Sequence, residues 1–99
     1  MAAYFIAQYV VKNPKLYREY QAGAAPTIQA GGGELVAFDV AAETIEGTPP
    51  GSQTVILKFA SREAAKAWYE SPAYQAVVGK RLAATEGFAV ISQSMNLGG

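Results

Sequence analysis

Few side chains in this sequence could do chemistry, because it contains neither histidine nor cysteine. That composition excludes Ser–His and Cys–His nucleophiles, and imidazole or thiolate metal sites. What remains is one polar residue inside each of three apolar segments: Gln8 in YFIAQYVV, Asp39 in ELVAFDV and Lys58 in TVILKF. A buried carboxylate has a shifted pKa, so Asp39 is the candidate general base. Alternatively, Asp39 and Lys58 lie at strand ends and meet water or each other.

Arg81 is the candidate anchor for an anionic ligand, because a guanidinium can hold a carboxylate through two parallel hydrogen bonds. In the alternative interpretation it ties its own connection, residues 80–86, to a nearby carboxylate such as Glu70 or Glu86. Asp39 and Arg81 are therefore the two candidate catalytic residues. No cofactor and no metal ion is expected.

Aromatic residues are concentrated in the segments predicted to be helical. Such side chains, packed over a sheet, could line a flat apolar pocket for an aromatic or acyl ligand. The candidate ligand-binding residues are Gln8, Tyr17, Trp68 and Tyr69. The alternative is that the aromatic residues form only the core, with Trp68 as its main anchor.

These residues must be positioned by strands and helices that the sequence indicates clearly. Asn13-Pro14 and Ser71-Pro72 each combine an N-cap side chain with a proline suited to a first helical turn. Pro26 lies inside the first helix and is expected to kink it or split it. Strands are predicted over residues 4–11, 34–40, 54–59 and 87–94, and helices over 14–30, 61–70 and 72–79.

This order predicts an α+β fold of ferredoxin-like βαββαβ type, a four-stranded antiparallel sheet with its helices on one face. The other face is then bare. Strands 4–11 and 54–59 carry apolar residues on both faces, so the bare face should be covered by another surface. We expect a homodimer, a dimeric α/β barrel, formed through the open sheet face.

The bulk properties narrow the partners further. The chain has 99 residues, which suits a single domain over residues 1–99, with an ordered core of about 4–95 and a loose tail. Its formal charge is zero and it has no basic stripe, so no nucleic-acid partner is expected. No segment approaches a membrane span of ~20 apolar residues, so no membrane partner is expected. The apolar start lacks the cations of a signal peptide, and we expect a cytoplasmic protein.

Several segments together resemble one known family: YFIAQYVVKNPKLYREY, PTIQAGGGELVAF, VILKFASREAAKAWYESPAYQAV and the strand after ATEG. Over residues 4–95 the chain is similar to the domain-of-unknown-function family numbered 1330. That family resembles the dimeric α/β-barrel superfamily of ferredoxin-like folds. The resemblance implies the fold and the dimer, and its relatives include cofactor-independent monooxygenases and haem enzymes that use a histidine ligand, which this chain lacks.

Two classes of function follow as hypotheses. The first is a cofactor-independent enzyme acting on a small organic or aromatic molecule. The second is a non-catalytic module that binds a small ligand or is purely a structural homodimer. The sequence leaves open whether the protein is an enzyme.

Overall fold

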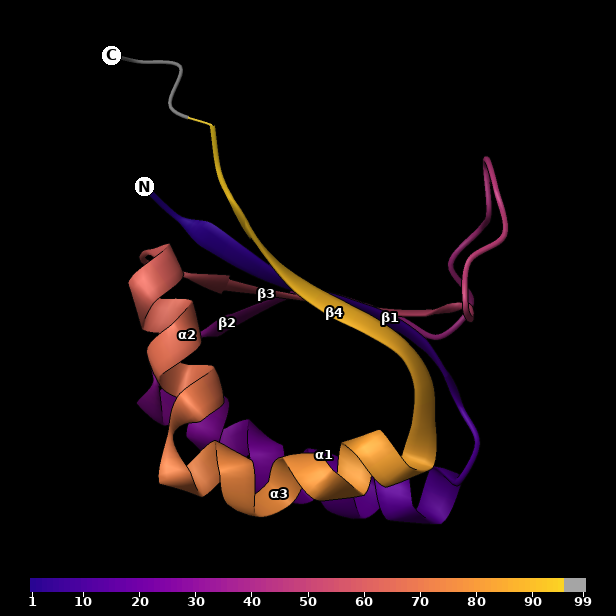
Figure 1. The fold of residues 1–99 in the computed structure, drawn as a ribbon, viewed down its shortest axis with the longest axis horizontal. Helices are drawn as coiled ribbons and strands as arrows, with labels where there is room; N and C mark the ends of the chain where they lie inside the picture. The colour runs from indigo at the N-terminus through magenta and orange to yellow at the C-terminus, as the bar shows by residue number, and fades with distance from the viewer. Residues whose placement is uncertain (96–99) are drawn as a thin grey trace.

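The computed structural model describes residues 1–95 and contains the predicted sheet and helices (Figure 1). Four antiparallel strands form one sheet in the order β2-β3-β1-β4, and the helices lie on one side of it. The ferredoxin-like α+β fold is thereby confirmed. The expected loose tail falls on residues 96–99, outside the described residues. In chain order the elements are β1 (Ala3–Val11), α1 (Pro14–Ala30), β2 (Glu34–Asp39), β3 (Gln53–Phe59), α2 (Arg62–Glu70), α3 (Pro72–Ala84) and β4 (Thr85–Gln93).

Each helix begins where a capping side chain predicts it. The Asn13 side chain accepts a hydrogen bond from the Leu16 amide at 3.1 Å and so caps α1. Ser61 accepts one from the Ala64 amide at 3.0 Å, and Ser71 caps α3 in the same way. These side chains satisfy amide groups that have no partner inside a helix.

Two details of the predicted helices are wrong. Pro26 does not split α1, which continues from Pro14 to Ala30 with Ala24 and Ile28, on either side of the proline, both packed on the core. The helix α3 extends to Ala84 instead of ending at residue 79, and β4 follows it directly. The predicted connection over residues 80–86 is therefore mostly helix. Its residues KRLAA form helices readily, and no glycine stops them.

The core lies between the helices and one face of the sheet. Along β1 the side chains at alternate positions from Ala3 to Tyr9 are buried on this face. Trp68 of α2 packs edge-on against Phe5, with ring centroids 5.2 Å apart, and lies 5.3 Å from Phe59. The connection between β2 and β3 projects away from the sheet (Figure 1). Among residues 1–95, no helix is both long and apolar enough to cross a membrane.

Within residues 1–95, no helix lies over the opposite face of the sheet. In register on β3, β1 and β4 lie Ile56, Ile6 and Val90, with Phe88 beside Gln8. Val90 and Phe88 are 48% and 47% exposed. This face is therefore apolar at its centre and uncovered in the single chain.

Candidate functional site

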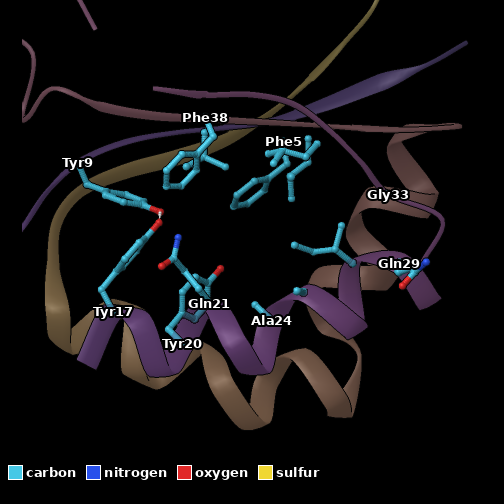
Figure 2. Close-up of a pocket in the computed structure, with 14 residues that line it drawn as sticks. Phe5, Tyr9, Tyr17, Tyr20, Gln21, Ala24, Gln29, Gly33 and Phe38 are labelled. Carbon is cyan, nitrogen blue, oxygen red and sulfur yellow. Dashed lines mark hydrogen bonds between the residues drawn. The ribbon is translucent and has the colours of Figure 1, made fainter. Parts of the chain in front are cut away.

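A cavity of about 260 Å³ lies between α1 and the helix-covered face of the sheet (Figure 2). Strands β1, β2 and β3 supply one wall, and α1 supplies the other. Most of the lining side chains are apolar or aromatic. The lining residues are Phe5, Tyr9, Tyr17, Tyr20, Gln21, Ala24, Ala25, Ile28, Gln29, Gly33, Leu35, Phe38, Val55 and Leu57.

The cavity opens along β2, which is one of the two edge strands of the sheet. Leu35 and Phe38 belong to its lining, yet they are 59% and 43% exposed. The helix α1 packs along α3, which leaves this edge of the sheet without a closely packed helix. Gly33 lets the chain start β2 close against the core, because a Cβ atom at this position would lie only 2.8 Å from the side chains of Ile28 and Phe59.

Tyrosine hydroxyls form the polar end of the cavity. Tyr9 of β1 and Tyr17 of α1 share a hydrogen bond with their oxygens 2.7 Å apart, and both rings line the cavity (Figure 2). Tyr20, also in the lining, shares a second 2.7 Å bond with Tyr74 of α3. Burial raises the pKa of Tyr9, Tyr17 and Tyr20 above the usual value for a phenol. All three therefore remain protonated at neutral pH and can donate hydrogen bonds.

Arg81 lies behind these tyrosines, in the core between α1, α3 and β1. Its side chain is 5% exposed, and its guanidinium carbon is 5.8 Å from the Tyr9 ring centroid and 6.0 Å from that of Tyr20. Within residues 1–95 it forms no salt bridge, and its buried Nε atom has no hydrogen-bond partner. Burial lowers the pKa of Arg81, but its interactions with Tyr74, Tyr20 and Tyr9 outweigh that effect, and the net pKa is raised. The guanidinium is therefore charged.

The alternative role of Arg81, tying a loop to a carboxylate, is contradicted by this placement. Arg81 belongs to α3, and Glu86 pairs with Lys12 at the surface. Glu70, at the end of α2, is exposed and forms no salt bridge among the described residues.

The structure does not bring Asp39 to Arg81. Asp39 is exposed at the end of β2, where its carboxylate accepts a hydrogen bond from the Ala41 amide at 2.9 Å. It is absent from the lining of the cavity, while Arg81 is buried. The prediction of an internal Asp39 is wrong, because β2 is an edge strand and its end reaches solvent. The alternative, a strand end in contact with water, describes Asp39 correctly.

The four predicted ligand-binding residues fall in different places. Tyr17 lines the cavity. Gln8 lies on the uncovered face of the sheet and donates to Thr54 Oγ1 at 3.2 Å, because alternate residues of a strand point to opposite faces. Trp68 is a core anchor whose indole donates to Thr27 Oγ1 at 3.1 Å. Tyr69 is half-buried against Phe5 and lines a more open groove beside β4.

The set of four candidate ligand-binding residues left out Tyr9, Tyr20, Phe38 and the small residues of α1, although Tyr9 and Tyr20 are among the aromatic residues expected to line a pocket. Two signals could have found part of this set. The alternation of β1 places Tyr9 on the same face as Phe5, and helical spacing places Tyr17, Tyr20 and Ala24 on one side of α1. Nothing in the sequence shows that α1 stands away from β2.

Among residues 1–95, no group of three or more His, Cys, Asp or Glu side chains is arranged to hold a metal ion. The site as described therefore consists of an apolar cavity, tyrosine hydroxyls at one end, and a buried cation behind them. Hydrogen-bond donation and electrostatic stabilisation of a negative oxygen are the chemistry that these groups can supply.

Comparison with known proteins gives one family and several similar structures. Residues 2–95 match the model of a family described as Domain of unknown function (DUF1330). A protein of unknown function from Rhodopseudomonas palustris superposes with a TM-score of 0.79 at 16% identity, over 96% of this chain and 83% of that one. SnoaB, a cofactor-independent oxygenase from Streptomyces nogalater, gives 0.68 at 14% identity, over 99% and 98% of the two chains.

A third structure is a proposed antibiotic biosynthesis monooxygenase from Caulobacter crescentus, with a TM-score of 0.63 at 16% identity over 92% of this chain and 85% of that one. No curated protein matches the sequence significantly. At these identities the similar structures establish a shared fold.

Proposed function

This chain belongs to the DUF1330 family of domains of unknown function, and we propose that it is a cofactor-independent enzyme acting on a small organic molecule. The observation that carries the proposal is the cavity between α1 and the sheet. Its volume of about 260 Å³ suits a ligand with few rings, and its apolar walls suit a flat aromatic framework. The tyrosine hydroxyls supply the few polar contacts that would orient such a ligand.

In the proposed reaction the substrate itself supplies the electrons that reduce O₂. None of the described residues that line the cavity is a carboxylate, and its tyrosines stay protonated, so the protein would act by hydrogen bonding and electrostatics. An activated CH₂ group and O₂ form a carbonyl group and water, a reaction in which atoms and electrons balance without an added reductant. The fold shared with the cofactor-independent oxygenase SnoaB supports this class of reaction.

Blocking the cavity tests the proposed function. Ala25 lies on α1, is exposed, and lines the cavity, whereas Ala22 is exposed on the same helix outside the lining. Flat neutral aromatics should raise the melting temperature of the natural protein, because a ligand that binds only the folded state stabilises it. We expect Ala25→Leu to reduce ligand binding at least tenfold and Ala22→Leu to leave it unchanged.

Calorimetric titration measures these affinities, and an oxygen electrode measures turnover of compounds with an activated CH₂ group. Equal binding by the two leucine variants would contradict the location of the site. Binding without any oxygen uptake across such compounds would contradict the enzymatic part of the proposal.

Non-catalytic ligand binding is the second candidate function. It is favoured by the lack of a general base among the described lining residues. Under this hypothesis a bound compound is recovered unchanged after prolonged incubation in air, whereas the enzyme hypothesis predicts an oxidised product by mass spectrometry.

We also propose that a second copy of the chain covers the open sheet face. Ile6, Ile56, Phe88 and Val90 give that face an apolar centre with polar side chains around it. An uncovered apolar sheet face is unfavourable in water, and an identical face of a second chain can pack against it.

A further inference from the structure

The charge of Arg81 has no counterion in the part of the chain that the structure describes. The side chains that interact with it are phenols from three elements: Tyr9 of β1, Tyr17 and Tyr20 of α1, and Tyr74 of α3. A charged group buried without a partner is strongly unfavourable. Such an arrangement is expected where a ligand supplies the opposite charge.

The same region also contains hydrogen-bond donors that the described residues leave unused. Each tyrosine pair, Tyr9 with Tyr17 and Tyr20 with Tyr74, shares one hydrogen bond, which uses one of its two hydroxyl hydrogens. No acceptor for the second hydrogen of either pair is found in residues 1–95. Gln53, directly across from Tyr9 in the sheet, has its buried side-chain amide beside the Tyr17 hydroxyl, and the buried Nε of Arg81 has no partner.

We propose that the cavity selects molecules with an ionised phenol or enol oxygen, which accepts hydrogen bonds from the tyrosine hydroxyls and is stabilised by the charge of Arg81. This inference rests on the proposed function, since it names the substrate class of the same cavity. The ring of the ligand would lie against the apolar wall, and its oxygen at the end where Tyr9 and Tyr17 meet (Figure 2).

A single negative oxygen fits the site better than a carboxylate does. Arg81 is not among the residues that line the cavity, so its guanidinium is screened from a ligand by the rings of Tyr9 and Tyr20. The paired, two-oxygen contact that an arginine makes with a carboxylate is therefore not available. The tyrosine hydroxyls at this end of the cavity can donate hydrogen bonds to a single oxygen atom of the ligand.

A pair of chromophores tests the inference. The probe para-nitrophenol ionises near neutral pH with a change in its absorption spectrum, and para-nitroanisole is its neutral methyl ether. We expect the ionised phenol to bind the natural protein about tenfold more tightly than the neutral form, which lowers the pKa of the bound probe by about one unit. The probe's absorbance, titrated against pH with protein in excess, gives this shift directly.

Two variants assign the effect to the cavity's polar end. Arg81→Met should abolish the lowering of the probe's pKa and leave the affinity for para-nitroanisole within about twofold, whereas Arg81→Lys should keep part of it. Tyr17→Phe removes a donor at the cavity wall and should reduce the shift on its own, so the test also stands if Arg81→Met does not fold.

The outcomes separate the two proposals. If para-nitroanisole binds but the pKa of bound para-nitrophenol is unchanged or raised, the inference is overturned and the proposed function stands. An unaltered shift in folded Arg81→Met would overturn the role of Arg81. If neither compound binds, both proposals are overturned.

Discussion

Arg81 combines two features that rarely occur together in a protein core. It is 5% exposed, and it has no carboxylate partner in residues 1–95. The desolvation of an ion costs several kcal/mol even after relaxation, whereas each contact with a tyrosine face returns about 0.5–2 kcal/mol. The rings of Tyr9 and Tyr20 therefore offset only part of the cost of burying Arg81. We interpret Arg81 as a residue whose charge contributes to ligand binding and does not stabilise the free protein.

Because the charge of Arg81 has no partner among the described residues, Arg81→Met should leave the free energy of unfolding unchanged or raise it by up to about 2 kcal/mol. Urea denaturation of both proteins without ligand, followed by circular dichroism, measures the difference. A loss of more than about 3 kcal/mol would show that Arg81 holds the core together, which our account excludes.

A close contact between the backbones of β1 and β4 fixes the position of Tyr9. Gly87 of β4 lies directly opposite Tyr9 in the sheet, and a Cβ atom at Gly87 would fall on the backbone of Gln8 and Tyr9. The missing side chain therefore lets β4 pass close to the backbone of β1 at Tyr9. Gly79, on the exposed side of α3, has open space where a Cβ would be.

These two glycines give matched substitutions. Gly87→Ala should lower the free energy of unfolding by about 2–3 kcal/mol through overpacking, and should weaken binding of aromatic probes because Tyr9 must move. Gly79→Ala should raise stability by about 0.5–1 kcal/mol, since alanine favours a helix. Thermal melts with and without ligand compare them. If Gly87→Ala and Gly79→Ala changed the free energy of unfolding equally, the close approach of β4 to β1 would be contradicted.

At the level of elements, the sequence predicted what local rules determine. The caps at Asn13, Ser61 and Ser71 placed the helix starts correctly, and segments rich in β-branched and aromatic residues placed the strands. The end of α3 was missed because KRLAA carries no stop signal. Contacts between distant residues were beyond local rules: Tyr20 and Tyr74 bond across 54 positions, and Asp39 is exposed only because β2 is an edge strand.

For the whole molecule, the uncovered sheet face predicts self-association. We expect a particle of about 21 kDa at micromolar concentration, twice the chain mass of 10.4 kDa. Val90→Lys would place charges in the middle of the interface and should yield the single chain. Leu82→Lys, at a similarly exposed apolar position on α3, should leave the larger particle intact. Sedimentation velocity measures the masses, and a natural protein that sediments as a 10.4 kDa chain would contradict the proposed dimer.

We expect the space between α1 and β2 to hold a flat ligand with its negative oxygen at the tyrosines. A crystal structure of the protein with para-nitrophenol bound would locate that ligand. We predict density for the ring between Ala24 and Phe38, with the phenol oxygen within hydrogen-bond distance of the Tyr9 or Tyr17 hydroxyl. A cavity closed by its own side chains, or a probe bound elsewhere with its oxygen in solvent, would contradict the account.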